Sequence, residues 1–152
     1  MTLHRTQWLG LFSRSSDQTL STILTRLGLN PDPDLQAAVW IRPVETGLMQ
    51  VLARADGMGA PFCFQETTST RASIRLSQGQ TGHAMILGHR TEHCKRVAWL
   101  DAKMQDPSFR DSLGTQLIEC LQDEERRLRA ERLAAAEQTR VEFFTLAREA
   151  GA

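Results

Sequence analysis

The sequence lacks the features of a secreted or membrane protein. It has only three cysteines, at positions 63, 94 and 120, and none of them forms a C-x-x-C pair. An odd and scattered set of this kind offers no disulfide framework and is typical of reduced thiols. The first residues lack the apolar core of a secretory signal, because His4, Arg5 and Arg14 interrupt it. No stretch approaches the ~20 apolar residues of a membrane-spanning helix. We therefore expect a cytoplasmic protein.

The sequence also lacks an excess of either charge. Its 18 Lys and Arg residues balance 18 Asp and Glu residues. This balance argues against extensive binding to nucleic acid or to an anionic membrane, each of which needs a basic excess. A net charge near zero also leaves little electrostatic repulsion to keep copies of the chain apart, which is tolerable if a partner covers part of the surface. The length of 152 residues fits one domain, residues 1–152, that needs no disulfide or metal for stability.

The first segment, residues 1–30, has helical spacing. Trp8 and Phe12 are four residues apart, and a second apolar stripe follows at Leu20, Ile23, Leu24 and Leu27. The run 15–17 (SSD) between them supplies N-cap oxygens, which predicts two short helices. The second helix is expected to end at Gly28, before the run 30–33 (NPDP).

The middle segment, residues 37–88, has the alternation of β-strands. Strand-like runs occupy about 38–41, 48–54, 61–67, 70–76 and 81–87, and turn-forming residues separate them. The connections are short, so neighbouring strands are expected to pair antiparallel in a central sheet of four to five strands.

One hairpin allows a register prediction. With Gln78 and Gly79 as a two-residue loop, Ile74 faces His83 and Arg71 faces Ile86. The core face then includes His83, and the opposite face carries two arginines, Arg71 and Arg75, above small residues. Such a face is a candidate shelf for an anion. A slip of one residue would reassign every side chain of the slipped strand.

The last segment, residues 90–150, is helical again. His93, Val97, Leu100 and Met104 form one apolar stripe, and Pro107 follows it. A long helical pattern then runs from about 112 to 149, with a highly charged stretch at 122–132 in which Glu125 and Arg129 have i,i+4 spacing. The sequence thus predicts an α+β fold with N-terminal helices, a central antiparallel sheet and a long C-terminal helix.

The C-terminal helix is long for so small a protein. A continuous helix over 117–149 would extend ~50 Å, whereas a compact chain of this size has a radius of gyration of about 15 Å. Either the helix breaks near its charged stretch or its end leaves the globule. In the second case a partner would have to cover its last apolar residues, Val141, Phe143, Phe144 and Leu146.

No complete active site emerges from the motifs. Histidines and cysteines at 63, 83, 89, 93 and 94 lack any zinc-binding spacing, so we expect no metal. There is no G-x-S-x-G, and no cysteine has an activating neighbour in the sequence. The lone G-x-G at 57–59 does not open a helix, so it is interpreted as a turn.

A few polar residues remain as candidates for ligand contacts. Arg71 and Arg75 are the best candidates for binding an anion, although a solvated strand face explains them equally well. Glu45 is either a functional carboxylate at the start of a strand or a cap of its own turn. His93 is either a contact residue or a hydrogen-bonded histidine of the core.

Six runs of the sequence, in order, resemble the PhnG family of the bacterial carbon–phosphorus lyase system. They are 45–48 (ETGL), 57–62 (GMGAPF), 70–76 (TRASIRL), 82–88 (GHAMILG), 93–105 and 139–145 (TRVEFFT). The chain departs from the family pattern at His89, where Asp is usual, and at Cys94 and Lys95, where Ala and Glu are common. The resemblance extends over nearly the whole chain.

The resemblance implies a role in phosphonate breakdown. PhnG-like proteins act with PhnH, PhnI and PhnJ in a core complex and with the ATP-binding protein PhnL. In the implied reaction an alkylphosphonate displaces adenine from C1′ of MgATP and gives α-D-ribose 1-alkylphosphonate 5-triphosphate. MgATP would be a substrate of the complex, and this chain alone would bind no cofactor. In the family PhnI is thought to carry the nucleosidase-like chemistry, so this chain would act as a subunit that is not catalytic alone.

The resemblance suggests Arg71 and Arg75 as anion contacts, with Glu45, His83 and His93 as secondary candidates. Two alternatives remain open. The chain is a purely structural adaptor of that complex with no residue in the active site, or it is a free-standing enzyme acting on a small molecule.

Overall fold

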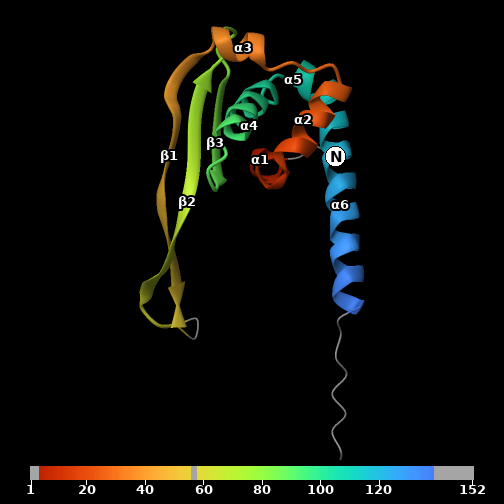
Figure 1. Ribbon diagram of the computed structural model, residues 1–152. Coiled ribbons are helices and arrows are strands. Elements are labelled where there is room, and N and C mark those ends of the chain that lie inside the picture. Colours follow the sequence, from red (N-terminus) through yellow and green to blue (C-terminus); the bar gives the residue numbers. More distant parts are fainter. Residues whose placement is uncertain (1–3, 56–57, 139–152) are drawn as a thin grey trace, which may run out of the picture.

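The computed structural model describes residues 4–55 and 58–138 and has the predicted α+β architecture (Figure 1). Two N-terminal helices and a short third one precede an antiparallel sheet, and helices follow it to the end of the described chain. Within the described ranges, no helix combines the length and the apolar character needed to cross a membrane. The elements in order are α1 (Arg5–Arg14), α2 (Asp17–Arg26), α3 (Asp32–Ala37), β1 (Val39–Arg54), β2 (Pro61–Arg75), β3 (Thr81–Leu87), α4 (Thr91–Lys103), α5 (Pro107–Phe109), the π-helical turn η2 (Arg110–Gly114) and α6 (Thr115–Gln138).

The N-terminal helices follow the sequence signals closely. Ser16 is the N-cap of α2, and its hydroxyl accepts a hydrogen bond from the Thr19 amide at 3.0 Å. Gly28 has a φ of 68°, which a residue without Cβ adopts easily at the end of a helix. The prolines after it do not prevent a further helix, α3, because Pro33 lies in its first turn, where no amide hydrogen is needed.

The sheet has three strands in the order β1–β2–β3, fewer than the four to five predicted. The five strand-like runs merge into three elements because irregularities in pairing replace the expected breaks. Register shifts near Arg42 and between Val51 and Leu52 keep β1 continuous. Pro43 is compatible with β1 because this strand lies at an edge, where one side of the backbone has no ladder to join.

The predicted register of the β2–β3 hairpin is wrong by one residue. Ile74 lies opposite Gly82, Ser73 opposite His83, and Arg71 opposite Met85. His83 is therefore on the exposed face instead of in the core. The physical reason is the packing of α4 on the sheet: a Cβ at Gly82 would lie 1.9 Å from the Ala98 carbonyl oxygen. Gly82, Ala84 and Ile86 are therefore buried on the helix side of β3, and Met85 and Leu87 are exposed.

The core lies between the sheet and the helices α1, α2, α4 and α6. The stripe predicted on α4 is confirmed, because His93, Val97, Leu100 and Met104 are all fully buried. α4 packs on β2 and β3, and α1 lies against α4, β3 and α6. Large side chains from several elements fill the centre, including Phe12, Leu20, Ile74, Trp99 and Leu117.

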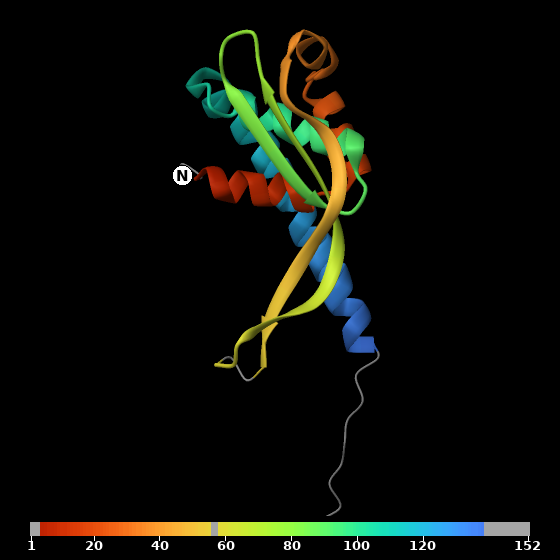
Figure 2. The ribbon, with the colours of Figure 1, turned by 90° about the vertical axis from the view of Figure 1, so that its left-hand side faces the viewer.

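The molecule has the shape of an arch with two legs (Figures 1 and 2). One leg is the twisted ribbon formed by residues 48–54 of β1 and 61–68 of β2, which extends beyond β3. We call this ribbon the arm. The other leg is α6, which is continuous over 24 residues and leaves the globule unbroken. The apolar cluster expected at 141–146 lies outside the described residues.

Candidate functional site

Four of the five predicted contact residues lie on the exposed face of the sheet, opposite the helices. Glu45 of β1 is paired with Arg71 of β2, and Arg75 follows further along the same face of β2. His83 of β3 lies opposite Ser73, between the positions of the two arginines. The register found in the structure, one residue from the predicted one, thus places His83 on the same face as the two arginines.

Glu45 is the centre of an ion triad. Its Oε1 accepts hydrogen bonds at 2.7 Å from the Arg42 Nη1 and from the Arg71 Nε. These hydrogen bonds, first that from Arg42 and then that from Arg71, lower the pKa of Glu45. Glu45 therefore does not cap its own turn, and it neutralises part of the charge that Arg71 would offer to a ligand.

Arg75 carries a charge on this face that no described residue compensates. It is exposed, and it makes no ion pair or side-chain hydrogen bond with any residue that the structure describes. Its guanidinium keeps all five N–H donors for solvent or for a ligand. Arg75 is accordingly a better anion contact than Arg71.

Ser73 and His83 form the second pair on this face. The Ser73 Oγ and the His83 Nδ1 are 2.8 Å apart. This contact is the geometry of a hydroxyl beside a base, but within residues 4–55 and 58–138 no carboxylate contacts the His83 ring. Glu45, a carboxylate on the same face of the sheet, is held by its two arginines. The arrangement thus lacks the third group that orients a catalytic histidine.

His93 lies on the other side of the sheet, away from the four residues above. It is fully buried in α4, with Nε2 3.0 Å from the Phe12 carbonyl oxygen. Its Nδ1 is 3.3 Å from Asp17 Oδ1, close enough for a charge interaction but not aligned as a hydrogen bond. Burial, and next the Arg90 charge, lowers the pKa of His93. The geometry favours the interpretation of His93 as a core histidine.

Asp101 is a buried polar residue that the sequence analysis did not single out. Its carboxylate is fully buried and accepts hydrogen bonds from the Arg5 guanidinium (2.9 and 2.5 Å), the Trp8 indole (3.2 Å) and the His83 backbone amide (2.9 Å). It therefore ties α1 and β3 to α4. A signal was present: Asp101 follows Val97 by four residues, so it shares the buried side of the helix.

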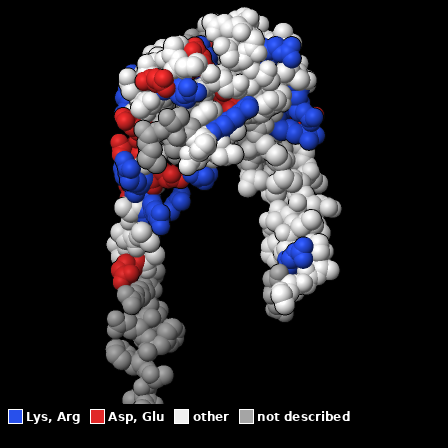
Figure 3. Space-filling model, turned by 180° about the vertical axis from the view of Figure 1, so that it is seen from behind, with Lys and Arg blue, Asp and Glu red and all other residues white. Residues whose placement is uncertain are grey.

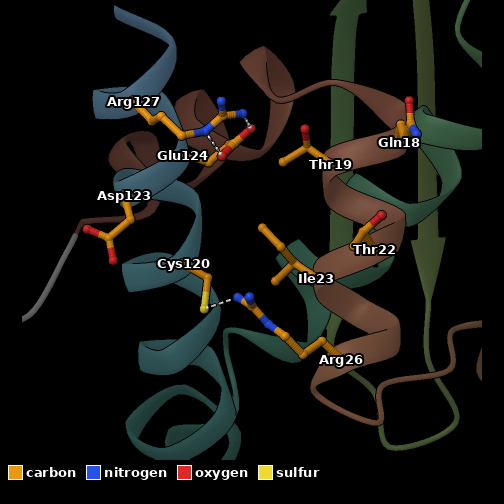
Figure 4. Close-up of a pocket in the computed structure, with 9 residues that line it drawn as sticks. All are labelled: Gln18, Thr19, Thr22, Ile23, Arg26, Cys120, Asp123, Glu124 and Arg127. Carbon is orange, nitrogen blue, oxygen red and sulfur yellow. Dashed lines mark hydrogen bonds and ion pairs between the residues drawn. The ribbon is translucent and has the colours of Figure 1, made fainter. Parts of the chain in front are cut away.

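A shallow groove lies between α2 and α6 (Figure 4). Arg26 donates to the Cys120 Sγ at 2.8 Å, and Arg127 binds Glu124 at 2.6 Å. The polar groups on its walls thus largely satisfy one another, so the groove shows no preference for a charged ligand.

A second cleft lies under the arch, between α1, the end of β3 and α6. Its volume is about 790 Å³, and five arginines but only two glutamates line it. The arginines are Arg14, Arg90, Arg126, Arg129 and Arg132. Its floor is apolar, with Leu11, Leu121 and Leu128 among the lining residues. The cleft therefore combines an apolar base with a positive rim.

Comparisons with known proteins agree on one family. A family model described as phosphonate metabolism protein PhnG matches residues 3–149. The chain is also 40% identical over 111 residues to a protein of Rhizobium meliloti (strain 1021) named α-D-ribose 1-methylphosphonate 5-triphosphate synthase subunit PhnG. That alignment includes 71% of this chain and 69% of the relative.

Proposed function

The chain belongs to the PhnG family of phosphonate metabolism proteins, and from this membership we propose that it is a subunit of an α-D-ribose 1-methylphosphonate 5-triphosphate synthase. The observation that carries the proposal is the 40% identity with the Rhizobium meliloti subunit of that name. The incomplete Ser73–His83 pair is consistent with a subunit that is not catalytic alone. The exposed apolar arm is consistent with assembly.

The proposed partners are PhnH-, PhnI- and PhnJ-like subunits, with a PhnL-like ATP-binding protein acting alongside them. In the proposed reaction of the complex, a phosphonate displaces adenine from C1′ of MgATP, so the activity is that of a transferase. MgATP is then a substrate of the complex instead of a cofactor held by this chain. We place the complex in the cytoplasm, which fits three unpaired cysteines, Cys63, Cys94 and Cys120.

We further propose that the exposed sheet face contributes to binding of a substrate anion. Both substrates carry phosphoryl or phosphonyl oxygens, which arginine binds through two parallel hydrogen bonds. Arg75 is free of described partners and can make such contacts, whereas Arg71 already donates to Glu45. His83 lies beside them and can add a ring N–H through its second nitrogen.

Alanine variants in the reconstituted complex test this anion contact. Arg75→Ala is expected to raise the KM for ATP or for methylphosphonate about five- to tenfold, the loss of one exposed charge-assisted contact. Arg71→Ala is expected to have a smaller effect, because Glu45 already holds part of its charge. Arg96→Ala on α4 is the matched control. Kinetics unchanged in the Arg71→Ala/Arg75→Ala double variant would leave the sheet face without a role in binding.

Co-purification tests the assignment as a subunit. The tagged chain, expressed with PhnH-, PhnI- and PhnJ-like proteins of the same organism, is expected to elute with them as one complex. A chain that elutes alone and has turnover by itself would support the free-standing enzyme. If the complex forms and every polar variant retains full activity, the chain is a structural adaptor.

A further inference from the structure

None of the residues that the structure describes covers the inner side of the arch, which is a different surface from the exposed sheet face. Figure 3 shows a hollow between the arm and α6, and the cleft described above lies at its top. We call this hollow the saddle: the arm is one wall, the cleft between α1 and β3 is the roof, and α6 is the other wall. None of the proposed substrate contacts lies on it.

The arm presents apolar side chains and almost no charge to this space. Among its described residues only Arg54 and Glu66 are charged. The register places Leu48 opposite Thr68, two residues from buried Thr70, so Leu48 faces the same side as the helices. Leu48 and Leu52, four residues apart on β1, are 72% and 62% exposed. A two-stranded ribbon of this kind is at best marginally stable in water alone, which favours a covering partner.

The opposite wall presents positive charge. Arg129 and Arg132 line the cleft and form no ion pair with any residue in the described part of the chain. The i,i+4 pair expected between Glu125 and Arg129 is not formed, because Glu125 binds Arg14 at 3.1 Å instead. The remaining arginines of the cleft are engaged, Arg126 by Asp123 and Arg90 by Asp17. Two uncompensated guanidinium groups thus face an apolar wall across the saddle.

We propose that the saddle receives an amphipathic helix from another subunit, with apolar side chains toward the arm and roof and acidic side chains toward Arg129 and Arg132. This inference rests on the proposed function, since it requires a multi-subunit complex. An inorganic anion would neutralise the arginines but would leave Leu48 and Leu52 exposed. The arm of a second copy would cover apolar surface, but its single described acid, Glu66, matches poorly with two arginines.

Competition during assembly tests the saddle. Wild-type chain and a variant, with different tags, are co-expressed with the PhnH-, PhnI- and PhnJ-like proteins, and their ratio in the purified complex is measured by mass spectrometry. Arg129→Glu/Arg132→Glu is expected to be incorporated about tenfold less than wild type, because both charges become repulsive to an acidic partner. Leu48→Ser/Leu52→Ser is expected to show a similar loss. Arg96→Glu, which also reverses a positive charge, at a half-buried position outside the saddle, should be incorporated equally with wild type.

The outcomes separate this inference from the proposed function. Equal incorporation of both saddle variants in an otherwise intact complex would overturn the saddle and leave the subunit assignment in place. Absence of the wild-type chain from any complex would instead contradict the proposed function. The variants change exposed side chains, and thermal unfolding of each purified chain confirms that incorporation, not folding, has changed.

Chemical cross-linking identifies the occupant. An Arg132→Lys variant keeps the charge and supplies an amine, which a carbodiimide couples to a carboxylate in direct contact. The expected product joins the introduced amine to an Asp or Glu of another subunit, in a segment with apolar residues at helical spacing. A cross-link to a second copy of this chain, or saturable binding of inorganic triphosphate by the purified chain that the double charge reversal abolishes, would overturn the proposal.

Discussion

Substitution of Gly82 by alanine tests the packing that fixes the register of β3. A Cβ at this position would lie 1.9 Å from the Ala98 carbonyl oxygen and 2.7 Å from the Ala102 amide nitrogen. Both atoms belong to the backbone of α4, so no side-chain rotation relieves the contact. An ordinary carbon contact is about 3.4 Å or longer, and α4 would therefore have to retreat by roughly 1.5 Å.

The expected cost follows from what α4 buries. Eight of its residues are buried, including Asp101, whose carboxylate accepts the His83 amide at 2.9 Å. A retreat of the helix loosens this packing and lengthens that hydrogen bond. Because the clash involves rigid backbone, we expect a loss of about 3 kcal/mol in the free energy of unfolding, at the upper end for overpacked cores. The melting temperature should fall by roughly 6–12 °C.

Urea denaturation followed by circular dichroism measures this loss, and Gly47→Ala is the matched control. Gly47 lies in the same sheet and has no positive φ, and a Cβ added to it would meet no atom within 4 Å. Its substitution should change stability by less than about 0.5 kcal/mol. If Gly82→Ala is as stable as Gly47→Ala, the close approach of α4 to β3 and the register derived from it are wrong.

Two further substitutions probe the buried polar groups. Asp101→Asn should lower the free energy of unfolding by about 3 kcal/mol in urea denaturation, because an amide group would face the donors of Arg5 and His83. The control, Glu125→Gln, changes an exposed ion pair and should cost less than about 1 kcal/mol. Equal effects of the two substitutions would refute the role of Asp101 as a buried acceptor that joins α1 and β3 to α4. Burial keeps the pKa of His93 below its ordinary value of 6.5, so the unfolded chain takes up this proton first as the pH falls. Stability should therefore decrease from pH 7 toward pH 5, and His93→Gln should flatten this dependence in denaturation series; an unaltered slope would exclude His93 as its source.

The helices and the fold class could be predicted because their signals are local. The Ser16 cap, the apolar stripe of α4 and the alternation in residues 37–88 each depend on spacing within a few residues. The strand count and the hairpin register could not be derived in this way. The runs 38–41 and 48–54 were expected to be separate strands, but an edge strand with shifted pairing accommodates Pro43 between them. The register depends on the contact of Gly82 with α4, a helix that comes later in the chain.

In the candidate site, too, features set by local spacing could be predicted and features set by tertiary contacts could not. Arg71 and Arg75 were placed on the exposed face because residues of one strand alternate, and this alternation is independent of the partner strand. His83 was assigned to the wrong face because its side depends on pairing. The Arg42–Glu45–Arg71 triad and the role of Asp101 required tertiary structure, since their members come from different elements. Whether the sheet face binds a substrate stays a prediction.

The measurement that tests the central claim most directly is adenine release from MgATP in the presence of methylphosphonate, with and without this chain. The assay uses the PhnH-, PhnI-, PhnJ- and PhnL-like proteins of the same organism, and the purified chain is added back to preparations that lack it. We predict that release requires the chain, is restored by adding it, and is absent with the chain alone. Equal release with and without the chain would contradict its assignment as a subunit of the synthase.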